Sequence, residues 1–169
     1  MDGPDRPLSP FQERLGRVAV QWMAGLNTVA LRLSGGRVTA HVPGGAPICL
    51  LTTTGRRTAR SRTVPLLYLP LGDGQIVVVA SRGGMSGHPA WYLNLCADPR
   101  AAVEVGGERW PVVARVATAE ERADHWPRLT AAYPRFALYQ SRTERLIPVV
   151  LLRPEGGPTG RRPPIPPAR

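Results

Sequence analysis

The sequence predicts an α+β protein built around a closed or half-open barrel of antiparallel strands with flanking helices. The expected elements follow the order β-β-β-α-β-β-α-α-β, and short turns join neighbouring strands. Because no βαβ unit repeats, a doubly wound dinucleotide-binding sheet is excluded as the organising theme. The length of 169 residues allows one domain with a substantial apolar core rather than two.

The ends of the chain differ from its middle. Residues 1–9 are polar and Pro-rich, residues 154–169 are dominated by Pro, Gly and Arg, and both segments are expected to be disordered. Within residues 10–36 apolar side chains recur at three- and four-residue steps, which predicts an amphipathic helix. Packing of this helix on the domain is favoured, and peripheral membrane contact through Trp22 and nearby arginines is the alternative. The barrel domain is expected to span residues 37–153.

The expected elements of the barrel domain follow from local signals. The apolar, β-branched run 48–54 ends at a glycine and predicts the first strand, and Pro89 suits the first position of a helix. A capping pattern beginning at Thr118 predicts another helix start. The remaining strands are expected at 62–69 and 75–81 around a turn at 71–74, in a hairpin of 101–105 and 108–116, and at 147–152. A loop at 82–84 precedes the helix that starts at Pro89 and ends before Asp98. The helix that starts at Thr118 is expected to reach residue 132, and a short helix covers 134–142.

The net charge of +10 indicates an anionic partner such as nucleic acid, anionic lipid or a phosphorylated small molecule. All 22 basic residues are arginines, so part of this charge reflects a composition rich in Arg, Gly, Pro and Ala, and only its placement is informative. Four arginines, Arg56, Arg57, Arg60 and Arg62, lie in one loop between two strands. Guanidinium forks bind phosphate and carboxylate oxygens in pairs. A solvated basic hairpin explains the loop equally well.

A second stretch, from Val79 to Gly84, follows a buried strand and precedes a helix start. Its small residues allow a planar ring or a phosphate to approach the backbone, and the helix N-terminus favours negative charge. Nucleic-acid binding ranks last, because no aromatic residue interleaves with the arginines of the loop.

No protein nucleophile or metal site is indicated. The three histidines show no ligand spacing, and Cys49 and Cys96 are interpreted as two reduced, buried thiols of a cytoplasmic protein. The N-terminus lacks the pattern of a secretory signal. An active site without its own nucleophile borrows chemistry from a cofactor, which leaves Tyr133 and Tyr139 as candidates for contact with a substrate.

Three linked runs carry a resemblance to a known family: LLTTTGRRTARSRTVPLLYL, VVVASRGGMSGHPAWYLNLCADPR and WPRLTAAYPRFALYQSRTERLIPVVLL. They closely resemble the deazaflavin-dependent nitroreductases, actinobacterial oxidoreductases that use coenzyme F(420). The resemblance covers residues 47–152 and implies a split β-barrel related to FMN-binding oxidoreductases. It also implies hydride transfer from the reduced coenzyme to an electron-poor acceptor: a quinone, an activated enone or a nitroaromatic.

The resemblance assigns roles residue by residue. Arg56, Arg57, Thr58 and Arg62 correspond to the clamp for the coenzyme's phosphate and polyglutamate tail. Tyr133 and Tyr139 match tyrosines near the substrate, and Ser81 or Tyr133 would stabilise or protonate a developing oxyanion. The expected ring-binding wall consists of Thr63, Val64, Pro65, Val79, Ala80, Ser81 and Arg82, with Gly83 and Gly84 allowing close backbone approach, and Trp91, Tyr92 and Asn94 on the helix that lines the pocket.

Two residues depart from the family pattern. Phe136 stands where the best-known prodrug-reducing member has a third tyrosine, which places nitroimidazole reduction in doubt. Ala59 replaces a common glycine and would tighten the arginine loop. An FMN-binding oxidoreductase on the same barrel and a non-catalytic deazaflavin-binding protein stay open as alternatives. The sequence leaves the oligomeric state undefined.

Overall fold

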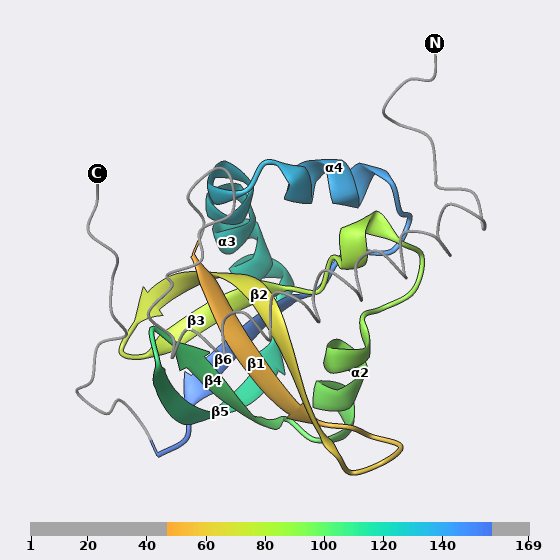
Figure 1. The fold of residues 1–169 in the computed structure, drawn as a ribbon. Helices are drawn as coiled ribbons and strands as arrows, with labels where there is room; N and C mark the ends of the chain where they lie inside the picture. Colours follow the sequence, from red (N-terminus) through yellow and green to blue (C-terminus); the bar gives the residue numbers. More distant parts are fainter. Residues whose placement is uncertain (1–46, 157–169) are drawn as a thin grey trace.

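The computed structural model describes residues 47–156, in which six antiparallel strands close into a barrel (Figure 1). Around the barrel the strands follow the order β1-β2-β3-β6-β5-β4. This confirms the predicted fold class. The elements are β1 (Ile48–Thr54), β2 (Ser61–Gly72), β3 (Gln75–Val79), the 3-10 turn η1 (Arg82–Gly84), α2 (Ala90–Ala97), β4 (Arg100–Val105), β5 (Glu108–Val116), α3 (Ala119–Ala132), α4 (Arg135–Ser141) and β6 (Val149–Pro154).

Several boundaries differ from the prediction for identifiable reasons. Pro89 has an extended ψ of 150° and caps α2 from outside, so the helix begins one residue later than expected. The last strand continues to Pro154 because its end pairs with β5, and the Glu155 N–H donates to the Pro111 carbonyl. Ordered structure thus reaches into the segment predicted to be a disordered tail. The predicted helix within residues 10–36 lies outside the described residues.

Two apolar clusters support the barrel, one inside it and one on its outer surface. β3 contributes to both, because its side chains alternate between the two faces. Ile76 and Val78 pack inside the barrel with residues of β1 and α2, whereas Val77 and Val79 pack outside with residues of α3 and α4. β6 does the same, which explains why both strands are continuous apolar runs.

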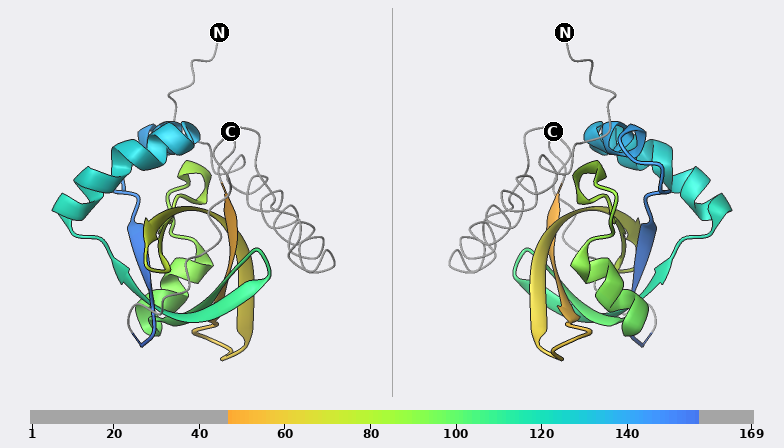
Figure 2. Two further views of the ribbon diagram at one scale, coloured as in Figure 1. Left: turned by 90° about the vertical axis from the view of Figure 1, so that its left-hand side faces the viewer. Right: turned by 90° about the vertical axis from the view of Figure 1, so that its right-hand side faces the viewer.

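The helices lie at different ends of the barrel. Figure 2 shows α3 and α4 together at one end and α2 toward the other, where α2 contacts β1. None of the helices among residues 47–156 is long and apolar enough to cross a membrane. Cys49 is buried as expected, but Cys96 on the outer side of α2 is exposed, so its expected burial is wrong.

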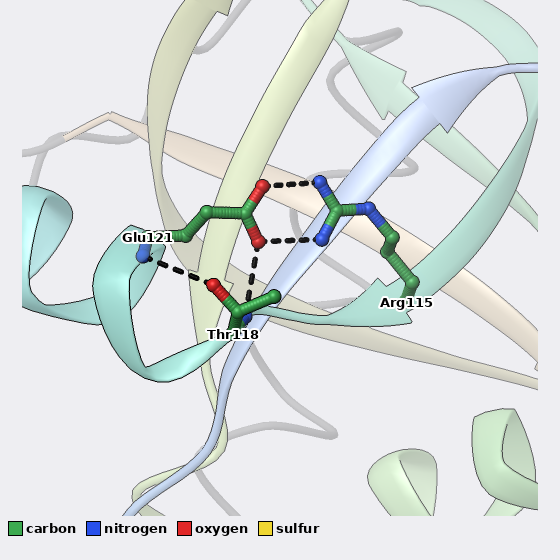
Figure 3. Close-up of polar contacts among 3 residues, drawn as sticks. All are labelled: Arg115, Thr118 and Glu121. Atoms are coloured by element: carbon green, nitrogen blue, oxygen red, sulfur yellow. Dashed lines mark hydrogen bonds and ion pairs between the residues drawn. The ribbon is translucent and has the colours of Figure 1, made fainter.

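The start of α3 is fixed by a reciprocal cap (Figure 3). The Glu121 N–H donates to the Thr118 hydroxyl at 3.3 Å, and the Thr118 N–H donates to the Glu121 carboxylate at 3.0 Å. Arg115, near the end of β5, donates with both terminal nitrogens to the same carboxylate. The direction in which the chain leaves the barrel toward α3 and α4 is therefore determined locally.

Candidate functional site

Two connected cavities open on the side of the barrel formed by β2 and α2. The first, which we call the arginine groove, has a volume of about 720 Å³, and the second, the apolar pocket, about 660 Å³. Both volumes are typical of small-molecule sites. The two cavities share four lining residues, so they form one continuous site: Arg56, Val64, Ala90 and Trp91.

The arginine loop between β1 and β2 is a tight turn. The Gly55 N–H donates to the Arg60 carbonyl at 2.9 Å, and the Ala59 N–H donates back to the Gly55 carbonyl at 2.8 Å. Ala59 has a φ of +52°, a left-handed conformation that favours glycine. The sequence predicts a tight arginine loop at Ala59. In the structure this alanine adopts a backbone conformation that is unfavourable for a residue with a Cβ atom.

Asn94 of α2 connects the helix to the arginine loop through hydrogen bonds. Its side-chain oxygen accepts a hydrogen bond from the Arg56 N–H at 3.2 Å, and its amide nitrogen donates to the Thr53 hydroxyl at 3.1 Å. Asn94 is only 5% exposed and Thr53 only 2%. A buried amide with both ends bonded rigidly connects the helix to the loop. Asn94 was predicted to line the pocket; in the structure it lines the arginine groove and binds the backbone of the arginine loop at Arg56.

Among residues 47–156, four arginines and no carboxylate line the groove: Arg56, Arg57, Arg62 and Arg109. Thr58 also lines it, as predicted, and so does Thr63, which was expected in the ring-binding wall, whereas Arg60 does not line it. Sequence reasoning missed Arg109, which lies on β5. It reaches the groove because β4 pairs with β5 on one side and with β1 on the other, a consequence of barrel closure.

The apolar pocket contains most of the predicted ring-binding wall. Pro65, Val79, Ser81, Arg82 and Gly83 line it together with the shared residues. The pocket-lining residues that the prediction did not include are Leu66, Leu67, Met85, His88, Pro89, Ala90 and Leu93; Phe136, noted above only as a departure from the family pattern, lines it as well.

Three predicted wall residues line neither cavity: Ala80, Gly84 and Tyr92. Ala80 is fully buried in the barrel core, because its side chain points inward. Tyr92 packs on His88 with ring centroids 4.8 Å apart.

Gly84 serves packing within the protein. A Cβ at this position would lie 2.7 Å from the Tyr139 carbonyl oxygen and 3.1 Å from the Arg142 Cβ. Gly84 thus allows the close approach of η1 to α4, and its expected role in admitting a ligand stays a prediction.

An aromatic edge closes the apolar pocket on the side of α3 and α4. The rings of Tyr133 and Phe136 are 5.0 Å apart, and those of Tyr133 and Tyr139 are 6.3 Å apart. Burial, followed by a hydrogen bond with Tyr139, raises the pKa of Tyr133 to about 12. Tyr133 is thus protonated at neutral pH and is a weaker acid than an ordinary tyrosine.

Arg145 was not predicted, although it organises the loop between β3 and α2. Its guanidinium donates to the Ser81 carbonyl at 2.8 Å and to the Met85 carbonyl at 3.0 Å, and one terminal nitrogen lies 3.4 Å from Nδ1 of His88. Burial lowers the pKa of Arg145, and the neighbouring Arg82 lowers it further. Within residues 47–156 no group of three His, Cys, Asp or Glu residues could hold a metal ion.

Comparison with known proteins is consistent with this geometry. Residues 23–154 match the family model of F(420)H(2)-dependent quinone reductases. An F(420)H(2)-dependent quinone reductase of Mycobacterium tuberculosis H37Rv is 38% identical over 148 residues, which cover 86% of this chain and 97% of that protein. A solved structure of an F(420)H(2)-dependent reductase, FDR-A, is 42% identical to this chain and superposes with a TM-score of 0.58. The match covers 63% of this chain and 94% of the FDR-A chain.

Proposed function

Because the chain belongs to the family of F(420)H(2)-dependent quinone reductases, we propose that the arginine groove and the apolar pocket together bind one coenzyme and one acceptor. The protein is an oxidoreductase, and its cofactor is coenzyme F(420). Family membership favours this coenzyme over the FMN alternative and favours catalysis over simple binding.

The continuity of a cationic groove with an apolar pocket is the observation that supports the proposal. The coenzyme combines an anionic phosphate and polyglutamate tail with a planar ring. In the part of the chain that the structure describes, four arginines line the groove without a carboxylate, which suits the tail. The wall formed by Val64, Pro65 and Val79 suits the ring. Trp91, which is 7% exposed, lines both cavities and would lie where ring and tail meet.

The protein's own contribution is binding, orientation and exclusion of water. The reduced coenzyme supplies a hydride when it is bound. Arg56 and Arg62 would hold its anionic part, with the loop kept in place by Asn94. The apolar pocket would exclude water and bring the acceptor into contact distance, which lowers the entropic part of the barrier.

Ser81, Tyr133 and Tyr139 are proposed to contact the acceptor. All three line the apolar pocket. With its raised pKa, Tyr133 donates a hydrogen bond and keeps its proton at neutral pH, so solvent would supply the proton that the reduced acceptor needs.

A quinone is the acceptor that the relatives' names support. Phe136 occupies the aromatic edge without a hydroxyl group, and it is 6% exposed. We therefore propose a preference for quinones over nitroaromatics and enones. A cytoplasmic location, with membrane contact through residues 10–36 as the alternative, belongs to the same proposal.

The groove assignment can be tested by titration with the oxidised coenzyme. The double variant Arg56→Ala/Arg62→Ala should weaken binding about tenfold or more, since each charge-assisted contact contributes about 1.5–3 kcal/mol when desolvated and less when exposed. Arg60→Ala is the control for the loss of charge, because it removes one positive charge from the same loop at a position outside the groove. Equal affinity of the double variant and the wild type would contradict the assignment.

The role of Tyr133 requires a second assay. Oxidation of the reduced coenzyme by menadione should be slower in Tyr133→Phe, while the dissociation constant of the coenzyme stays unchanged. Unchanged turnover would remove Tyr133 from the mechanism.

A further inference from the structure

His88 lines the apolar pocket between η1 and α2, and the reaction outlined above does not use it. Its ring is held on two sides. Tyr92 packs on the ring with centroids 4.8 Å apart and planes inclined by 35°, and a terminal nitrogen of Arg145 lies 3.4 Å from Nδ1. A histidine that is oriented this firmly at the edge of a cavity presents one fixed polar atom to a ligand.

The contact with Arg145 determines which ring nitrogen carries the proton. A guanidinium has only N–H donors, so Nδ1 of His88 must act as the acceptor. In a neutral imidazole the proton then resides on Nε2. Burial, followed by the positive charge of Arg145, lowers the pKa of His88, which favours the neutral ring at neutral pH.

The position of Arg145 is itself secured by other contacts. Its guanidinium also donates to the backbone carbonyls of Ala80 at 3.2 Å, Ser81 at 2.8 Å and Met85 at 3.0 Å. These carbonyls belong to the segment between β3 and α2, so the guanidinium cannot turn away from His88 without losing several hydrogen bonds. Arg145 is therefore a positioning residue that fixes the tautomer of His88.

We propose that His88 is a binding residue of the apolar pocket whose Nε2–H donates a hydrogen bond to a carbonyl oxygen of the bound ring. The inference rests on the proposed function, because it assumes that this pocket holds a planar ring with carbonyl groups. Both the coenzyme ring and a quinone carry such oxygens.

The chemical benefit is largest if the oxygen belongs to the quinone. Reduction of a quinone to a hydroquinone adds two electrons and two protons. The hydride brings both electrons and the first proton, so one oxygen carries negative charge after it has arrived. The Nε2–H would stabilise that charge and retain its own proton, and water would supply the second proton. A neutral imidazole in this role is a hydrogen-bond donor rather than an acid.

Three variants separate the hydrogen bond from the packing role of the ring. In His88→Gln the amide nitrogen can occupy the place of Nε2 and keep a donor there. In His88→Asn the side-chain oxygen can still accept from Arg145, but no donor reaches the pocket. His88→Phe keeps the aromatic contact with Tyr92 and removes both polar atoms. His125→Asn, on α3 outside the lining of both cavities, is the control.

Two measurements test the inference. The dissociation constant of the oxidised coenzyme and the kcat and KM for menadione are determined for each variant. His88→Asn and His88→Phe should lose about tenfold in one of these quantities, with His88→Gln largely restored. A loss in coenzyme affinity assigns the bond to the coenzyme, and a loss confined to kcat/KM assigns it to the quinone. Equal behaviour of His88→Gln and His88→Asn would overturn the proposal.

Nitrogen NMR of the histidine rings in the coenzyme-free protein gives a readout independent of turnover. The resonances that disappear in His88→Asn identify His88, and they should show a protonated Nε2 and an unprotonated Nδ1. A proton on Nδ1 would refute the inference. Failure of wild-type protein to bind the coenzyme would instead refute the proposed function, and the tautomer measurement would still stand by itself.

Discussion

The replacement Gly84→Ala tests how the aromatic edge is attached to the barrel. Gly84 has a φ of +80°, and an added Cβ would lie 2.7 Å from the Tyr139 carbonyl oxygen. That oxygen belongs to the backbone of α4 and cannot rotate away as a side chain would. The methyl group therefore has to displace either η1 or α4.

The expected loss of stability has two parts. An alanine in the left-handed region costs about 1–2 kcal/mol. Overpacking against a rigid neighbour adds about 1–3 kcal/mol. Gly83→Ala isolates the first part, because Gly83 has a φ of +68° and, apart from its chain neighbours, no atom of residues 47–156 lies within 4 Å of an added Cβ. The free energy of unfolding should fall by about 1–2 kcal/mol in Gly83→Ala and by about 2–5 kcal/mol in Gly84→Ala.

Urea denaturation measures this difference. The midpoints should differ between the two variants while the slope of the unfolding free energy with urea stays the same. Equal losses in both variants would show that α4 does not press on Gly84, and the packing described above would then be wrong.

The same variants distinguish two roles of Gly84. Since α4 carries Phe136 and Tyr139, its displacement should raise the KM for menadione and leave the dissociation constant of the coenzyme unchanged. Weaker coenzyme binding with an unchanged KM for menadione would instead indicate that Gly84 contacts the ligand, as the sequence predicts.

Three further variants follow from the described contacts. Ala59→Gly should raise the free energy of unfolding by about 1 kcal/mol, because glycine adopts the left-handed conformation of residue 59 without strain. Urea denaturation measures this change, and a lower free energy of unfolding in the variant would contradict the strain at Ala59. Asn94→Ala should lower it by about 1–3 kcal/mol and weaken coenzyme binding, because the buried Thr53 hydroxyl and a loop N–H lose their partner. The Arg115 guanidinium and a backbone N–H hold the pKa of Glu121 at about 2, below its ordinary 4.5, so its stabilisation is present above pH 4.5 and is lost as the pH falls toward 2. The difference in Tm between the wild type and Glu121→Gln should therefore shrink over that range, and a constant difference would exclude the ion pair as its cause.

Local signals account for the part of the fold that could be predicted. The strand at 48–54 and the start of α3 agree with expectation, because a β-branched run before a glycine and a capping pattern act over a few residues. The ends of β2 and β6 are set by pairing with other strands, so their extension to residues 72 and 154 could not be read from the chain alone.

The site shows the same division. Arg56, Arg62 and Trp91 line the cavities. They could be predicted as site residues because they belong to short, recognisable sequence motifs. Arg109 and Arg145 were missed, since each acts on residues far away in the sequence: Arg145 contacts the Ser81 carbonyl across 64 positions. Only the closed barrel brings these segments together.

The two apolar clusters allow the two parts of the site to change independently in evolution. Trp91 of α2 is supported from inside the barrel, whereas Phe136 and Tyr139 rest on the outer cluster. Mutations that repack the outer cluster can therefore reshape the proposed acceptor side of the site and leave the arginine groove unaltered. Descendants of one ancestral barrel could in this way exchange oxidants while they inherit the same coenzyme.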